Sequence, residues 1–211
     1  MTTHKNRADL IITLLPLIGI ALFVIFYIIA AIYYPGGSYV APNRPGFSFK
    51  NNYLCDLLDN HAINGAFNSA RIYARIALAI LCLSLILLWY YLPKLFDRKN
   101  KAQTIMSIAG MLSMVITLFL ASEVHDTIVR IAGFFGVTAL LIAFIELYKA
   151  NYYKLLILGI ICLLLFLTNY YIYETEILID KLPVIQKITF LSCMSWFALL
   201  SIHSYRKLVS T

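Results

Sequence analysis

The stretch LIITLLPLIGIALFVIFYIIAAIYY, residues 10–34, runs for 25 residues without a charged side chain. A helix needs about 20 consecutive apolar residues to cross the hydrocarbon core of a bilayer, and a helix satisfies its own backbone hydrogen bonds there. The stretch therefore predicts a membrane-spanning helix. It exceeds the core of about 7 to 15 apolar residues that is typical of a signal peptide, and no small-residue cleavage pattern follows it, so we expect this helix to be kept.

The composition of the whole chain extends this prediction. Of its 211 residues, 62% are hydrophobic and 13% are charged, and the mean hydropathy is +0.83, whereas ordinary soluble domains are only about half apolar. We predict an all-α fold, a polytopic bundle of six transmembrane helices that forms a single integral membrane domain. The predicted helices cover residues 10–34, 72–92, 104–121, 127–148, 155–173 and 183–204.

Two connections between these helices differ from the rest. A polar loop of residues 35–71 joins the first two helices and opens with the turn signals of Pro35-Gly36-Gly37-Ser38. Within this loop, the apolar spacing from Tyr53 to Leu58 predicts a short amphipathic helix. The third and fourth helices are separated only by residues 122–126, SEVHD. This spacing predicts a hairpin with a minimal turn or, alternatively, one broken helix.

The Lys and Arg residues set the predicted orientation, because cytoplasmic loops carry an excess of these residues. With the N-terminus inside, the cytoplasmic segments contain ten of the 17 basic residues and three acidic ones, whereas the outer segments contain seven of each. Both termini are therefore predicted to be cytoplasmic, and the loop of residues 35–71 is predicted to face outside. Because the basic residues are scattered over short loops, no nucleic-acid partner is expected.

The fourth predicted helix carries a single stripe of small residues. Four of them follow His125 at intervals close to multiples of 3.6 residues, and small residues mark the faces where transmembrane helices approach each other. If the helix begins at His125, its imidazole is thus predicted to point into the bundle. The stripe consists of Ala132, Gly136, Ala139 and Ala143.

At the inner end of the same helix, Glu146 is expected to pair with Lys149 or Lys154.

Several ionisable residues cluster at the predicted outer ends of the second, third and fourth helices. Arg71 and Arg75 stand on one helix face and require anions, either from acidic side chains or from a ligand phosphate or carboxylate. Asp126 and Arg130 are spaced to pair along one helix. Ionisable groups at this depth are costly and are usually paired or functional, so the cluster is either a structural salt-bridge network or a polar cavity that binds a ligand. In the second case, the predicted ligand-binding residues are Arg71, Arg75, Glu123 and Arg130.

The same segments contain residues for acid–base chemistry. His125 can act as a base that Asp56 or Asp126 orients, with Cys55 or Ser38 as the nucleophile. Whether the protein is an enzyme stays open; as an enzyme, it would be a membrane-embedded hydrolase or acyl transferase. Carboxylates and imidazoles also offer ligands for a divalent metal, although no fixed spacing such as H-E-x-x-H is present. The candidate metal ligands are Asp56, His61, Glu123, His125 and Asp126.

Three short elements precede the histidine that opens the small-residue helix. They are Tyr34-Pro35-Gly36-Gly37, Gly46-Phe47-Ser48-Phe49 and NYLCDL at residues 52–57. Together with His125, they resemble a group of prokaryotic six-helix membrane proteins that is distantly similar to the DRAM family of autophagy modulators and to factors that remodel GPI-anchor lipids. The resemblance covers the chain in topology and is specific only in these elements. It implies six helices, lipids as ligand or substrate, a prokaryotic inner or plasma membrane, and functional roles for Asp56 and His125.

The favoured hypothesis is an integral membrane protein with an outward-facing polar site that binds or modifies a lipid headgroup or another anionic small molecule. A small transporter or channel is the first alternative, but it requires polar residues through the membrane midplane, and the fifth and sixth helices offer few. The second alternative is a non-catalytic scaffold, in which the polar cluster is a structural network and the partner is another membrane protein or a second copy of the chain.

Overall fold

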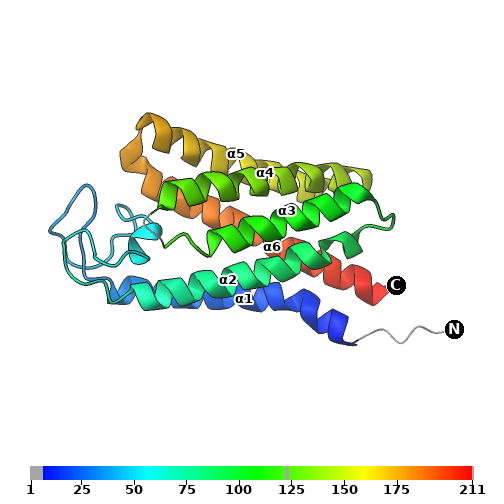
Figure 1. Cartoon of the computed structure of the whole chain (residues 1–211), viewed down its shortest axis with the longest axis horizontal. Helices are drawn as coiled ribbons and strands as arrows, with labels where there is room; N and C mark the ends of the chain where they lie inside the picture. The colour runs from blue at the N-terminus through cyan, green and yellow to red at the C-terminus, as the bar shows by residue number, and fades with distance from the viewer. Residues whose placement is uncertain (1–6, 122–123, 211) are drawn as a thin grey trace.

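The protein folds into six α-helices joined by short connections and one long loop (Figure 1). The computed structural model describes residues 7–121 and 124–210, and no β-strand lies within these ranges. The predicted all-α class and the six helices are confirmed. The helices are α1 (Arg7–Tyr33), α2 (Arg71–Tyr91), α3 (Lys101–Thr117), α4 (His125–Lys149), α5 (Tyr153–Thr175) and α6 (Leu182–Ser210).

The six helices form a closed ring. Each helix packs against the next one along the chain, and α6 returns to pack against α1. The loop of residues 34–70 covers one end of the ring, which we call the loop end. The start of α1 and the last turns of α6 lie at the opposite end, which we call the base (Figure 1). The helix directions therefore alternate around the ring.

Five segments are long and apolar enough to cross a membrane, which is compatible with an integral membrane protein. The exception is α3, whose 17 residues extend for about 25 Å at a rise of about 1.5 Å per residue, less than the core thickness of about 30 Å. The helix stops at Thr117 rather than at the predicted residue 121. Beyond Thr117, the amides of Phe119 and Leu120 bond carbonyls three residues back, so the chain tightens into turns. The five segments are Ile11–Tyr33, Arg71–Leu95, His125–Lys149, Tyr153–Thr175 and Ile179–Ser210.

The small-residue stripe of α4 faces the bundle, as predicted. Ala132, Ala139 and Ala143 are buried, and the Ser113 hydroxyl of α3 donates a hydrogen bond to the Ala132 carbonyl at 2.8 Å. A Cβ atom at Gly136 would lie only 3.1 Å from the same hydroxyl oxygen. The small side chains thus let α3 and α4 approach closely.

Two indole rings fill the core towards the base. Trp196 of α6 donates from Nε1 to the Leu155 carbonyl of α5 at 2.8 Å. A Cβ atom at Gly159 would lie 2.6 Å from the Phe144 ring and 2.9 Å from Trp196. On the other side of the ring of helices, a Cβ atom at Gly110 would lie 2.2 Å from the Trp89 indole. Each tryptophan therefore occupies space that only a glycine on the facing helix leaves open.

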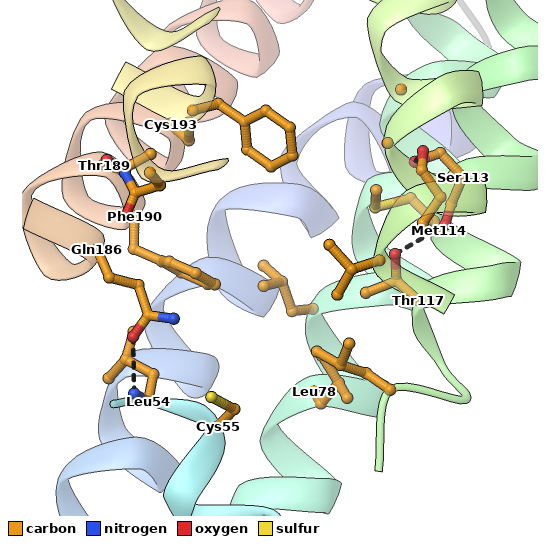
Figure 2. A pocket seen from close by; sticks show the side chains of 18 of the residues that line it. Leu54, Cys55, Leu78, Ser113, Met114, Thr117, Gln186, Thr189, Phe190 and Cys193 are labelled. Carbon is orange, nitrogen blue, oxygen red and sulfur yellow. Dashed lines mark hydrogen bonds between the residues drawn. The ribbon is translucent and has the colours of Figure 1, made fainter. Parts of the chain in front are cut away.

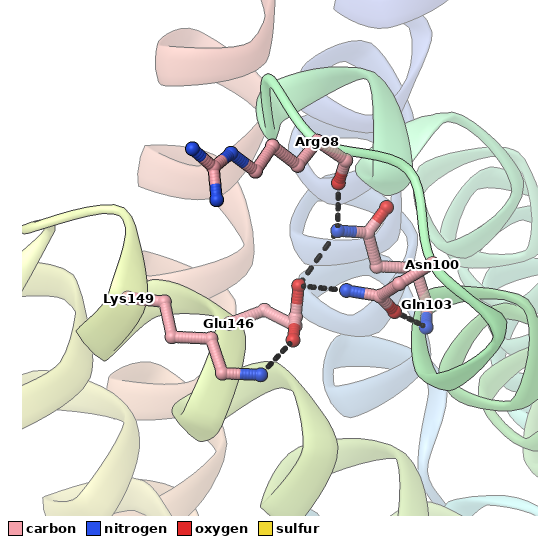
Figure 3. A network of polar contacts seen from close by, with 5 residues as sticks. All are labelled: Arg98, Asn100, Gln103, Glu146 and Lys149. Carbon is pink, nitrogen blue, oxygen red and sulfur yellow. Dashed lines mark hydrogen bonds and ion pairs between the residues drawn. The ribbon is translucent and has the colours of Figure 1, made fainter.

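A polar network closes the base (Figure 3). The Glu146 carboxylate of α4 accepts hydrogen bonds from the side-chain amides of Gln103 at 2.6 Å and Asn100 at 2.9 Å. It also pairs with Lys149 at 2.9 Å, which confirms one of the two predicted partners. Because Asn100 caps α3 by accepting from the Gln103 amide, this network joins the end of α4 to the start of α3.

Candidate functional site

A cavity of about 440 Å³ lies inside the ring of helices. All six helices contribute to its wall, which is almost entirely apolar, and the cavity extends from the loop end to Trp89 and Trp196. Figure 2 shows Leu54 and Cys55 of the loop on one side of this space, with Phe190 of α6 beside them and helix α3 opposite. Its volume falls within the range of about 300–1,000 Å³ that small-molecule pockets occupy.

The charged residues that line this cavity, within the described part of the chain, gather at its mouth between α4 and α5. Arg130 forms an ion pair with Glu174 at 2.8 Å, and the Tyr173 hydroxyl donates to Asp126 at 3.1 Å. His125 Nδ1 lies 3.2 Å from the same Asp126 oxygen. All five residues line the cavity. Asp126 and Arg130 were expected to pair with each other, and the structure instead gives each of them a partner on α5.

Asp56 occupies a different environment from the one expected for a catalytic carboxylate. It is buried within the short 3-10 helix η1 (Cys55–Leu57), and its Oδ2 accepts hydrogen bonds from Asn52 Nδ2 at 2.8 Å and from the Tyr53 amide at 2.9 Å. Burial raises the pKa of the Asp56 carboxyl, while these two hydrogen bonds oppose the rise. The carboxylate is thus turned towards the backbone of its own loop rather than towards His125.

Arg71 and Arg75 fasten the loop to α2. Arg75 donates to the Leu58 carbonyl from Nε at 3.0 Å and from Nη2 at 2.8 Å. Both arginines donate to the Asn60 side chain, at 2.8 and 3.1 Å, and the Arg71 guanidinium stacks 4.2 Å from the centre of the Phe67 ring. These contacts tie both guanidinium groups, which were predicted to bind an anion, to the loop. The predicted ligand residue Glu123 lies outside the described residues.

Two buried asparagines, Asn52 and Asn68, organise the loop. Asn52 bonds Asp56 and also donates to the Gly37 carbonyl at 2.7 Å while accepting from the Ser48 amide at 2.9 Å. Asn68 donates to three carbonyls, including that of Asp59 at 2.9 Å. Both side chains are fully buried. An asparagine in a loop normally signals a turn, so no sequence pattern distinguishes these two.

Helix α6 holds the other side of the loop. Lys187 is only 8% exposed, and its ammonium donates to the carbonyls of Asn52 at 2.5 Å and Pro183 at 2.9 Å. The neighbouring Gln186 accepts from the Leu54 amide at 2.8 Å (Figure 2). Lys187 is one of the seven basic residues of the predicted outer segments. The loop is therefore a fixed cap, bonded to both α2 and α6.

The two proposed nucleophiles lie apart in this cap. Ser38 is buried, and its hydroxyl accepts from the Ala41 amide at 3.1 Å. Cys55 lines the cavity, but burial raises the pKa of its thiol to about 12, and the nearby carboxylates of Asp56 and Asp59 add to the rise. Because the thiolate is the reactive form of cysteine, this environment keeps Cys55 in its unreactive state at neutral pH.

We expect Cys55 to react slowly with alkylating reagents. A thiol with a pKa of about 12 contains about 2,000-fold less thiolate at pH 8 than an ordinary cysteine with a pKa of about 8.5. Iodoacetamide labelling of the native protein, followed by peptide mass spectrometry, should show a correspondingly slow rate that rises with pH. Urea-unfolded protein provides the reference rate. Labelling of native Cys55 at the reference rate would restore it as a candidate nucleophile.

The candidate metal ligands are distributed over separate places. His61 lies in the loop, where its ring packs edge-on against Phe67, while Asp56 and His125 occupy the environments described above. Within residues 7–121 and 124–210, no three His, Cys, Asp or Glu side chains come together in a group that could hold a metal ion. A metal role therefore gains no support from the described part of the chain.

Comparison with known proteins provides no relative. No protein-family model matches the chain, and no curated protein or solved structure matches it significantly. The similarity to six-helix membrane proteins related to the DRAM family stays a prediction from short sequence elements. The functional argument consequently rests on the cavity, its mouth and the cap.

Proposed function

We propose that the protein is an integral membrane protein that binds a single lipid in its central cavity, with the hydrocarbon chain between the helices and the headgroup at the mouth. The observation that carries this proposal is the cavity itself, whose wall is almost entirely apolar and whose charged lining residues, in the described part of the chain, lie where α4 and α5 meet at the loop end. A lipid has the same distribution of apolar and polar groups.

The energetics of an apolar cavity support this ligand class. Water is excluded from cavities that offer it no hydrogen-bond partners, and apolar molecules bind there instead. Each square ångström of apolar surface that a bound chain removes from water contributes about 25 cal/mol. The floor of the cavity at Trp89 and Trp196 is apolar too, which argues against the alternative of a channel, since a channel requires a continuous polar path.

The mouth favours a neutral or zwitterionic headgroup over an anion. Among the described residues, its charged side chains are two carboxylates, Asp126 and Glu174, and one guanidinium, Arg130, which already pairs with Glu174. Arg71 and Arg75, the expected anion ligands, are bonded to Leu58 and Asn60 instead. For these reasons, we propose a neutral or zwitterionic headgroup in place of the anionic ligand that the sequence alone suggested.

Binding is better supported than turnover. His125 Nδ1 lies 3.2 Å from Asp126 Oδ1, so the histidine could act as a base that the aspartate orients. A hydrolase or acyl transferase of this type also needs an activated nucleophile. The raised pKa of Cys55 keeps it as a thiol, and the Ser38 hydroxyl is buried in the cap, where it accepts a hydrogen bond from the Ala41 amide. We therefore assign His125 and Asp126 to recognition of the headgroup.

We further propose that the loop end faces outwards and the base faces the cytoplasm of a prokaryotic cell. The positive-inside rule supports this orientation, because the connections and the chain end at the base are rich in Lys and Arg. The mouth would then open towards the outer leaflet. The basic residues concerned are Lys94, Arg98, Lys99, Lys101, Lys149, Lys154, Arg206 and Lys207.

A cavity-filling substitution tests the proposal. Leu140 of α4 lines the cavity, whereas the adjacent Leu141 is exposed on the outside of the bundle. Leu140→Trp should displace the lipid, since an overpacking penalty of about 1–3 kcal/mol lowers affinity about 5- to 150-fold. Leu141→Trp is the matched control and should retain lipid like the wild type.

The measurement is the amount of lipid that stays bound to protein purified in mild detergent, determined by native mass spectrometry. Both variants must elute as the same monodisperse species as the wild type for the comparison to count. Wild-type protein without bound lipid, even after incubation with a monoacylglycerol, would overturn the proposed function. Equal retention by the two tryptophan variants would place the lipid outside the cavity.

A further inference from the structure

The side of the cavity between α4 and α5 is its least tightly closed wall. Among the helix pairs that are neighbours in the ring, α4 and α5 make the fewest contacts. Within this wall, Gly133 of α4 faces the ring of Phe166 of α5. A Cβ atom added at Gly133 would lie 3.9 Å from that ring, which is ordinary van der Waals contact. A larger residue could be accommodated there, so the two helices are not drawn together as α3 and α4 are.

Several residues along this seam face both the cavity and the outside of the bundle. Phe166, Tyr170 and Tyr173 of α5 line the cavity, yet they are 38%, 40% and 49% exposed. Arg130 and Glu174 behave in the same way at the loop end. A side chain that is exposed on both sides marks a thin wall, so the interior is separated here from the surrounding bilayer by a single layer of side chains.

Two polar contacts join α4 to α5 at the loop end of the seam. They are the ion pair between Arg130 and Glu174 and the hydrogen bond from Tyr173 to Asp126. Exposed contacts of this kind contribute little to stability and can open at low cost. Below them, the side chains that flank the seam and line the cavity are mostly apolar or aromatic, among them Val129, Val137 and Phe166. A hydrocarbon chain can replace the contacts of these three side chains without the loss of a hydrogen bond.

We infer that the seam between α4 and α5 is a lateral portal, and that the ligand is therefore a lipid resident in the bilayer rather than a molecule that arrives from the aqueous phase. This inference rests on the proposed lipid-binding function. At the loop end, the cap is bonded to α2 and α6 through Arg75 and Lys187, so it restricts entry over that side of the cavity. The seam opens instead towards the hydrocarbon core, where lipid chains already lie.

The two tryptophans of the chain provide a direct probe of entry. Trp89 and Trp196 both line the cavity, and they are only 2% and 1% exposed. A lipid outside the bundle cannot touch their rings. A monoacylglycerol with a brominated chain, added to proteoliposomes, should quench tryptophan fluorescence only when its chain enters the cavity, and the time course gives the rate of entry.

Cross-linking of the seam tests the route. The double variant R130C/E174C, bridged by a short bis-maleimide, should admit the brominated lipid at least about tenfold more slowly. The same variant without the linker lacks the ion pair and should admit it several-fold faster than the wild type. The matched control is Y33C/Y73C, which bridges two aromatic rings that stack 5.2 Å apart on the α1–α2 side and should leave the rate unchanged.

The outcomes separate the portal from the lipid site. Absence of quenching in the wild-type protein would overturn the lipid site and, with it, the portal. Quenching that proceeds at the wild-type rate in bridged R130C/E174C would overturn the portal alone. Equal slowing by the Y33C/Y73C bridge would also count against the portal, because it would show that any restraint on the bundle limits entry.

Discussion

Replacement of Asn52 by alanine should loosen the cap over the cavity while leaving the helices folded. The Asn52 side chain supplies a donor to Gly37, a donor to Asp56 and an acceptor for the Ser48 amide, and all of these groups are distant from water. Each buried group left without a partner costs about 1–3 kcal/mol. We therefore expect a local loss of about 3 kcal/mol or more, because three groups are affected.

Hydrogen exchange measures this loss where it occurs. In Asn52→Ala, the amides of residues 48–58 should exchange about 100-fold faster than in the wild type, since 1.36 kcal/mol corresponds to a factor of ten. Amides in the middle of α2 should keep their protection. Asn43→Ala, which alters an exposed asparagine of the same loop, should leave the exchange pattern unchanged. Identical exchange in the two variants would contradict the role assigned to Asn52.

The expected link between cap and cavity follows from the position of residues 53–58. Cys55 and Leu58 belong to the cavity wall, and the Leu54 amide is bonded to Gln186 of α6. Loosening of the cap should therefore also speed the loss of the bound brominated lipid in Asn52→Ala. The helices would hold the rest of the cavity in place, so binding would weaken without being abolished.

Helix positions were predictable because the bilayer imposes a simple rule on the sequence. Long uncharged runs such as residues 10–34 have no alternative fold in lipid, and the stripe that includes Ala132 and Ala139 identified the inward face of α4. The end of α3 was less predictable. Apolar residues continue to Ala121, yet the chain turns after Thr117 because three-residue hydrogen bonds replace the helical ones.

The candidate site was only partly predictable. The sequence predicts roles for His125, Asp126 and Arg130 because ionisable residues at membrane depth are costly and are usually paired or functional. All three residues line the cavity mouth. The α5 partners of Asp126 and Arg130 could not be foreseen, since pairing depends on how helices pack around the ring. The roles of Asp56 and Lys187 could not be predicted either. The sequence shows that they are charged, but only the fold shows that both side chains hydrogen-bond to the loop backbone.

Replacement of Glu146 by leucine should destabilise the whole bundle at its base. The carboxylate is only 4% exposed, and it provides the acceptor for Gln103 and Asn100 at the start of α3. Removal of one partner from a buried charged cluster costs about 3–5 kcal/mol. In a chain of this size, each kcal/mol lowers Tm by about 2–4 °C, so we expect Glu146→Leu to melt about 10 °C below the wild type in detergent.

Two further variants separate the parts of this network. Lys149→Ala removes a partner that is 61% exposed, and exposed pairs contribute about 1 kcal/mol or less, so its Tm should fall by only a few degrees. Glu146→Gln keeps a carbonyl acceptor for one of the two amides and should melt between Glu146→Leu and the wild type. A loss in Lys149→Ala as large as that in Glu146→Leu would show that the ion pair, rather than the acceptor for α3, holds the base together. Since the cavity extends down to Trp89 and Trp196, both near the base, Glu146→Leu should also reduce lipid retention, whereas Lys149→Ala should not.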